Sequence, residues 1–329
     1  MMVDAEDAAD ALDATDGDEP HGVGAERLAR RITARDITAT FFAYAWRNDA
    51  RIEVPGTFLV ALLNDFGVAA PNARATLRRL ERDGLIESRR SGRNLFFRAA
   101  ELSRTRAEPG VHRILNVGRV EEWSGVWTVV AFSVPEQQSR IRMALRDSLR
   151  LEGFAPFYDG VWIAPGDLRE VAVRKADVRG VEQLSAHLAD DGSFLSRGRQ
   201  PIESWDLEGI NSAYRVVLAE AEAVSAAAAD GTLSPSAALV RRTLLLTRYR
   251  RLVPLDPGLP TDMMPEGWLR REVRAAVAQA FDGLASLASF RIEQLLDGID
   301  DGWGERVRAW AGLTLDELAT LVPGAPDAP

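Results

Sequence analysis

The sequence predicts an α+β protein of several domains: an N-terminal winged helix-turn-helix, a central ferredoxin-like α/β sandwich and a C-terminal helical domain. Three observations predict this. Three helical patterns and a hairpin pattern come first, a strand–helix–hairpin–helix pattern follows, and helical patterns alone continue to about residue 321. With 329 residues and 46% hydrophobic composition, the chain can bury two or three separate cores.

Both ends are predicted to be disordered tails. Residues 1–25 hold eight Asp or Glu residues, no Lys or Arg and almost no large apolar side chain, so they cannot bury enough surface to offset chain entropy. Residues 323–329 have a similar composition. The domains expected between the tails are a DNA-binding winged helix-turn-helix at 26–104, a ferredoxin-like domain at 119–205 and a helical effector and dimerisation domain at 206–322.

The winged helix-turn-helix is predicted from periodicity and turn residues. Thr57 is expected to cap the second helix and Gly67 to end it. The third helix opens at Pro71, a favoured first helical position, and stops at Gly84. The expected elements are a helix containing Ile32, Ile37, Phe41, Phe42 and Tyr44, helices at Thr57–Phe66 and Pro71–Asp83, and a hairpin of Leu85–Arg90 and Arg93–Arg98 around Ser91-Gly92.

The other two domains are predicted in the same way. The middle one should hold a strand at Trp127–Val134, a helix burying Ile141, Leu145 and Leu149 and closed by Gly153, a hairpin of Phe154–Tyr158 and Val161–Ala164 around Asp159-Gly160, and a helix from Asp167. A fourth strand lies within Gly192–Arg199 or is displaced. Helices are expected at Asn211–Ala229, Ser236–Leu252, Trp268–Ile299 and Trp303–Leu321.

The distribution of charge points to nucleic acid. The formal net charge is −9, but residues 26–98 hold fourteen arginines against eight acidic residues. A local excess of cations is typical of a phosphate-binding surface, and it matters more than the total charge. In the helix from Pro71, the helical spacing predicts that Ala73, Leu77 and Leu80 face the core. The arginines of this helix then lie on its other faces.

This helix therefore provides candidate DNA-binding residues. Arg can pair bidentately with guanine and Asn with adenine, and a recognition helix meets base edges near its N-terminus. We expect Asn72, Arg74, Ala75 and Arg78 to face bases and Arg79, Arg90 and Arg93 to bind phosphates. The alternatives are an ordinary solvated helix face and a hairpin whose charges only protect an edge strand.

A second group of cations lies in the C-terminal domain. One predicted helix carries two pairs of arginines, Arg241-Arg242 and Arg250-Arg251. Guanidinium groups are suited to binding an anionic ligand. Tyr249 and Trp268 complete this candidate effector site. The alternative is that the arginines complement the helix dipole and pair with local acids.

Several functions are disfavoured by composition. The chain has no cysteine and three separated histidines, which leaves no thiol nucleophile, no typical metal-ligand spacing and no Ser/His/Asp arrangement to argue from. No apolar run has the length of a membrane helix, and the acidic N-terminus lacks the pattern of a secretory signal. We expect a cytoplasmic protein that is not an enzyme and has no catalytic residues, metal or cofactor.

The order and spacing of four stretches resemble the PaaX family of phenylacetate-catabolism repressors. They are Gly84-Leu85 with Gly92-Arg93; Trp123–Thr128; Gly153-Phe154 with Gly160–Pro165; and Arg242–Leu245 with Tyr249–Arg251, Asp256–Pro260, Pro265 and Trp268. The resemblance implies a homodimer that represses a catabolic operon at a palindromic operator. It also implies release by an aryl-CoA thioester, typically phenylacetyl-CoA.

The resemblance also supplies an alternative function. The middle domain looks like the ferredoxin-like nuclease subunit of CRISPR adaptation, whose first strand ends in a metal-binding Asp. Ser133 or Val134 stands at that position here, which disfavours metal-dependent cleavage. Thr247-Arg248 and Leu269-Arg270 replace an expected His-Glu and Pro-Gly, which leaves the effector open. A regulator that acts mainly through protein partners is the third possibility.

Overall fold

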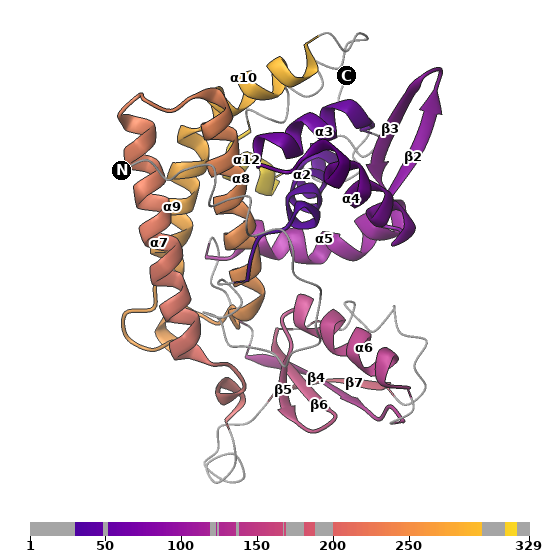
Figure 1. Ribbon diagram of the computed structural model, residues 1–329. Helices are drawn as coiled ribbons and strands as arrows, with labels where there is room; N and C mark the ends of the chain where they lie inside the picture. The colour runs from indigo at the N-terminus through magenta and orange to yellow at the C-terminus, as the bar shows by residue number, and fades with distance from the viewer. Residues whose placement is uncertain are drawn as a thin grey trace.

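The computed structural model contains three units, of which the first and the middle one pack against a third unit of C-terminal helices (Figure 1). It describes residues 30–48, 52–118, 123, 125–135, 138–166, 168, 181–187, 200–297 and 313–320. Both predicted tails lie outside these residues, as does all of the helix expected from Asp167 up to residue 180 except Leu168.

The first unit holds three helices and a small antiparallel sheet. Its elements are α2 (Ala34–Asn48), β1 (Val54–Pro55), α3 (Gly56–Asp65), α4 (Ala70–Arg82), β2 (Ile86–Ser91) and β3 (Asn94–Ala99). The strand order is β1-β3-β2, and the β2–β3 hairpin projects from the body (Figure 1). The prediction that Thr57 caps α3 is wrong, because the helix begins one residue earlier and Pro55 occupies the N-cap without a side-chain hydrogen bond. Gly67 follows the helix with φ of +79°, as a left-handed stop requires.

A helix that the sequence analysis did not predict follows the hairpin. It is α5 (Glu101–Asn116), and it lies between the first unit and the middle unit (Figure 1). Pro109 and Gly110 fall inside this helix. Both residues disfavour helix interiors, so they concealed it in the sequence pattern.

The middle unit is a four-stranded antiparallel sheet with one described helix. Its elements are β4 (Val126–Phe132), α6 (Ser139–Leu151), β5 (Ala155–Tyr158), β6 (Val161–Pro165) and β7 (Val181–His187), in the order β5-β6-β4-β7. Asp159-Gly160 forms the predicted turn. The fourth strand is β7, which precedes Gly192–Arg199, so of the two expected alternatives the displaced strand is correct. Ile141 does not join Leu145 and Leu149 in the core; its side chain is 41% exposed.

The two faces of this sheet pack against different partners. Val130, Trp162 and Ala164 face Leu145 and Leu149 of α6. Trp127 and Ile163 belong to the large core that also includes α5 and the C-terminal helices. Alternate residues of a strand point to opposite faces, so the sheet can join α6 to the rest of the molecule.

The C-terminal unit is helical in the described residues. Its elements are η4 (Pro201–Ser204), α7 (Leu207–Ala229), α8 (Pro235–Leu252), η5 (Val253–Leu255), η6 (Thr261–Met263), α9 (Arg270–Gly283), α10 (Ala285–Leu296) and α12 (Leu315–Thr320). The single helix predicted at Trp268–Ile299 is wrong: it starts at Arg270, breaks at Leu284 beside Gly283, and Ile299 lies outside the described residues. Residues 303–312 of the last predicted helix also lie outside them.

A buried carboxylate holds the C-terminal unit together. Asp256 is fully buried, and its Oδ1 and Oδ2 accept hydrogen bonds from Arg270 at 2.5 and 2.9 Å. The Tyr214 hydroxyl donates to Oδ2 at 2.6 Å, and the Gly258 amide donates to Oδ1 at 2.6 Å. Burial, with the charge and the hydrogen bond of Asp256, raises the pKa of Tyr214 well above its usual value, so its hydroxyl stays protonated and donates.

The substitution Arg270→Met should destabilise the protein strongly, because it leaves Asp256 buried without its cation. We expect a loss of about 3–5 kcal/mol in the free energy of unfolding. Arg98→Met, which breaks an exposed pair with Glu87, should cost about 0–1 kcal/mol. Denaturant unfolding of both variants measures the difference, and equal losses would contradict the role assigned to Asp256.

Candidate nucleic-acid interface

Helix α4 presents one apolar and one polar face. Ala73, Leu77 and Leu80 are buried against the first unit. The exposed side is formed by Asn72, Arg74, Ala75, Arg78, Arg79 and Arg82. Pro71 lies in the first turn, where its missing N–H costs no hydrogen bond. The helix therefore exposes each residue that the sequence analysis selected on it.

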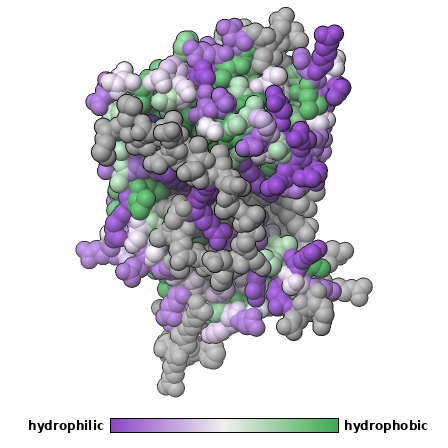
Figure 2. Space-filling view, viewed as in Figure 1, coloured by the Kyte–Doolittle hydropathy of each residue, from purple (hydrophilic) through white to green (hydrophobic). Residues whose placement is uncertain are grey.

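The β2–β3 hairpin adds cations beside this face. Arg90 and Arg93 are exposed close to the Ser91-Gly92 turn, in which Gly92 has φ of +58°. Two other hairpin arginines are paired: Arg89 binds Glu53 with both Nε and Nη2, and Arg98 binds Glu87 at 3.0 Å. Hydrophilic residues gather at the upper right of the molecule, where the hairpin and α4 lie (Figures 1 and 2).

The exposed arginines of α4 and of the hairpin tip lack acidic partners. None of the six forms an ion pair or a side-chain hydrogen bond with another described residue. We call the six the arginine surface: Arg74, Arg78, Arg79, Arg82, Arg90 and Arg93. Ten other arginines of the described residues bind an Asp or Glu. A cationic surface left uncompensated in an acidic protein is suited to an external polyanion.

Helix α4 is fixed to its surroundings by polar contacts at its C-terminal end. Glu81 accepts a hydrogen bond from Ser88 of β2 at 2.5 Å. Asp83, the C-cap, pairs with Arg35 of α2 at 2.7 Å. Because α4 is tied to both the hairpin and α2, the arginine surface has a defined geometry.

The first unit is also bound firmly to the C-terminal helices. Leu239, Ala288 and Ile292 of α8 and α10 belong to the same buried cluster as Phe41 and Phe58. Across this contact Arg291 of α10 binds Asp65 of α3 through Nε at 2.7 Å and Nη2 at 2.8 Å. The orientation of the arginine surface is thus coupled to α8 and α10.

The predicted effector residues do not form one cluster. Arg242 is buried, donates to the carbonyls of Phe281 and Leu313, and stacks on the Phe281 ring at 3.6 Å. Burial lowers its pKa to about 9. Tyr249 and Trp268 are buried as well, and Trp268 packs edge-on against Tyr214. Arg241 is exposed, and about 13 Å of helix separates it from Arg250.

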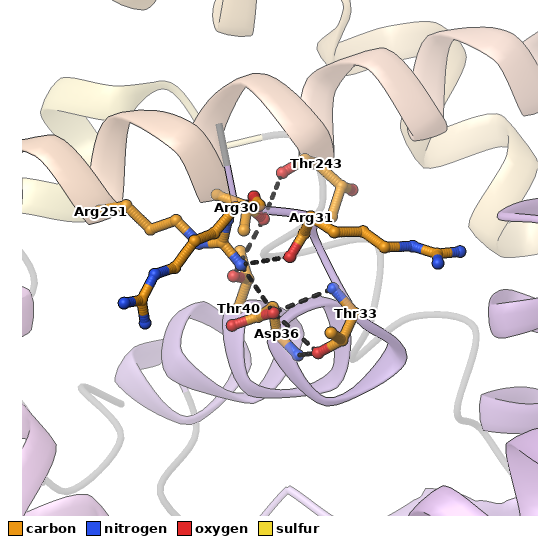
Figure 3. Close-up of polar contacts among 8 residues, drawn as sticks. Arg30, Arg31, Thr33, Asp36, Thr40, Thr243 and Arg251 are labelled. Atoms are coloured by element: carbon orange, nitrogen blue, oxygen red, sulfur yellow. Dashed lines mark hydrogen bonds and ion pairs between the residues drawn. The ribbon is translucent and has the colours of Figure 1, made fainter. Parts of the chain in front are cut away.

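Arg251 holds the start of the first unit (Figure 3). It donates to the carbonyls of Arg30 and Arg31, and it pairs with Asp36 at 2.8 Å. Burial alone would raise the pKa of Asp36, but hydrogen bonds from Thr33 and the charges of Arg251 and Arg250 outweigh burial and lower it. The side chains of Arg30 and Arg31 point away from this contact to opposite sides (Figure 3).

Arg250 and Arg251 also line a cavity that the sequence analysis missed. It has a volume of about 340 Å³ and lies between α2, α4, α5 and α8. Phe42, Leu80 and Ile86 contribute apolar walls, and Arg104 of α5 adds a third cation. These residues are far apart in the sequence, so no local pattern brings them together.

The alternative nuclease site finds no support in the described residues. Strand β4 ends at Phe132, and Ser133 and Val134 follow it, with no carboxylate at its end. Within the described ranges, no three His, Asp or Glu residues are grouped as metal ligands. No described helix is both long and apolar enough to cross a membrane.

Comparison with known proteins identifies the family. Three models match in order: "PaaX-like protein" at residues 34–103, "PaaX protein central Cas2-like domain" at 120–192 and "PaaX-like protein C-terminal domain" at 205–293. The chain belongs to the PaaX family. The three PaaX models divide the chain close to the boundaries of the three units, and the Cas2-like model corresponds to the β4–β7 sheet.

Two individual proteins are similar along most of the chain. The transcriptional repressor PaaX of Escherichia coli strain K12 is 24% identical over 241 residues, which cover 70% of this chain and 74% of that protein. Among solved structures, uncharacterized protein Rv0674 from Mycobacterium tuberculosis is 22% identical with a TM-score of 0.47, covering 80% of this chain and 98% of that one.

Proposed function

We propose that this PaaX-family protein is a transcriptional repressor that binds double-stranded DNA through its first unit, acting as a winged helix-turn-helix. The order of three helices and a β-hairpin supports this, with α4 as the recognition helix and β2–β3 as the wing. The observation that carries the proposal is the arginine surface, whose six cations are exposed and unpaired among the described residues.

The exposed residues divide into two roles. Asn72, Arg74 and Ala75 lie in the first half of α4, where side chains meet base edges in the major groove, and Arg78 lies one turn after Arg74 on the same exposed face. Arg79, Arg90 and Arg93 lie farther along the helix or on the wing and bind phosphates, which provides affinity rather than sequence choice. Repression then results from occupation of an operator of a catabolic operon.

Substitutions in α4 and in the wing should separate these roles. Arg78→Ala should cost about 1–3 kcal/mol of discrimination at one base pair, because a base contact is lost. Arg93→Ala should weaken binding to all sequences and reduce the salt slope by about one. Fluorescence anisotropy with DNA from upstream of the protein's own gene measures both effects.

Arg215→Ala is the matched control, because Arg215 is an exposed arginine on α7, distant from the hairpin (Figure 1). Unchanged binding in both Arg78→Ala and Arg93→Ala would refute the residue assignment. Absence of DNA binding by the unmodified protein would instead favour a regulator that acts through protein partners.

We propose that the operator is palindromic and that a homodimer binds it. Two half-sites recognised by two copies of α4 must lie about one helical turn, roughly 34 Å, apart. Light scattering should therefore give the mass of two chains, and footprinting should protect two half-sites at this spacing. A single chain that protects one half-site would contradict the dimer.

We propose further that a small-molecule effector, an aryl-CoA thioester such as phenylacetyl-CoA, releases the DNA. Among the candidate effector residues, Arg250 and Arg251 line the cavity, whereas Arg242, Tyr249 and Trp268 make contacts in the core. The cavity has the size of a small-ligand site, with apolar walls and cations. Leu80 at the end of α4 forms part of its wall, so a ligand there would press on the recognition helix.

Substitution of two arginines on α8 tests whether the effector binds in the cavity or near Arg241. Phenylacetyl-CoA should bind Arg250→Gln about tenfold more weakly than the unmodified protein, because a cation that lines the cavity is lost. Arg241→Gln should bind normally, because Arg241 is exposed and does not line the cavity. Calorimetry measures the affinities, with CoA alone as the ligand control. A loss confined to Arg241→Gln would place the effector near Arg241, in the first half of α8.

A further inference from the structure

We propose that the acidic N-terminal segment, residues 1–25, docks on the arginine surface of its own chain and competes with DNA for it. The inference rests on the proposed DNA-binding function and adds a regulatory partner to that surface. The charges are complementary: the segment has eight carboxylates and no Lys or Arg, and the surface has six arginines with no acidic partner among the described residues.

Helix α2, the first described helix after the segment, begins beside one end of this surface. Arg251 of α8 holds the backbone carbonyls of Arg30 and Arg31 at the entrance to α2 (Figure 3). Within one turn of that entrance, Arg35 pairs with Asp83, the C-cap of α4. The chain therefore enters beside the end of α4 that carries Arg79 and Arg82.

The length of the segment is sufficient for docking. Twenty-five residues can span up to about 80 Å at roughly 3.3 Å per residue, whereas the 13 residues of α4 extend about 20 Å. A tether of this kind holds the carboxylates near the arginines at an effective concentration of about millimolar. Individually weak, exposed ion pairs are then enough to occupy the surface for part of the time.

Docking should alter DNA binding in two ways. It should lower the apparent affinity, because DNA must displace the segment before it contacts the arginines. Docking should also reduce the salt dependence of DNA binding. The arginines are then already paired with carboxylates, so that fewer ions are exchanged with the solution when DNA binds. Both effects depend on the charge of the segment and not on its exact sequence.

Three forms of the full protein test this inference: the unmodified chain, a deletion of residues 2–25, and a chain whose eight acidic residues in that segment are changed to Asn or Gln. The deletion retains each described residue. On a duplex of unrelated sequence at about 50 mM salt, both altered forms should bind about tenfold more tightly than the unmodified chain. The difference should shrink at about 200 mM salt, where charges are screened.

The outcomes separate docking from the proposed function. Equal affinity of all three forms overturns docking and leaves DNA binding intact. A gain in DNA affinity in the deletion but not in the Asn/Gln form also overturns docking, because the bulk of the segment and not its charge would then hinder DNA binding. If none of the forms binds DNA, the proposed function fails, and docking is judged by a direct measurement without DNA.

That direct measurement uses a fluorescent peptide of residues 1–25. The protein that lacks residues 2–25 should bind it with a dissociation constant of about 0.1 mM at low salt, because an effective concentration of about 1 mM then gives the tenfold effect on DNA binding. The double substitution Arg78→Ala and Arg93→Ala should weaken this binding severalfold, whereas Arg215→Ala should not. Failure of the peptide to bind, or equal binding by both variants, overturns docking.

Discussion

The carboxylate of Asp256 organises the centre of the protein. A buried negative charge is costly unless cations and hydrogen-bond donors surround it. Arg270 of α9, Tyr214 of α7 and the amide of Gly258 provide those donors, so the two helices and the connection between α8 and α9 are fixed together. The carbonyl of Asp256 then accepts from Arg113 of α5, whose other terminal nitrogen reaches the carbonyl of Glu152 after α6.

The DNA-binding candidate is attached to this centre by contacts of several kinds. A shared apolar cluster joins it to α8 and α10, and the Arg291–Asp65 and Arg251–Asp36 pairs lie across the same boundary. The Thr247 hydroxyl of α8 donates its proton to the Thr243 carbonyl. The Thr247 Oγ1 atom can therefore accept a hydrogen bond from the Thr40 hydroxyl of α2, at 3.1 Å. A ligand bound between these elements, as proposed, would have packed side chains on both sides of it, and this arrangement can convert binding into a shift of α4.

Sequence patterns predicted the elements whose structure is determined by residues close together in the chain. Pro71, Leu77 and Gly84 defined α4 because helical periodicity and end signals are contained within one short segment. Pro109-Gly110 concealed α5, and a single residue, Leu284, separates α9 from α10. Arg241 and Arg242 look equivalent in the sequence, yet adjacent residues on a helix point about 100° apart, so one is exposed and the other is buried. The cavity forms only where segments far apart in the sequence pack together, so no local spacing of residues could predict it.

The apolar cluster shared by the first unit, α8 and α10 limits how freely this protein can be recombined. In a chimera that carried only the first unit, Phe41 and Phe58 would lose the cover that Leu239 and Ile292 provide, and apolar surface exposed in this way favours aggregation. The first unit therefore depends on the C-terminal helices to cover its apolar surface. Under the proposed function, a change of operator would come from substitutions in the arginine surface, because its side chains have no described partner that must change with them.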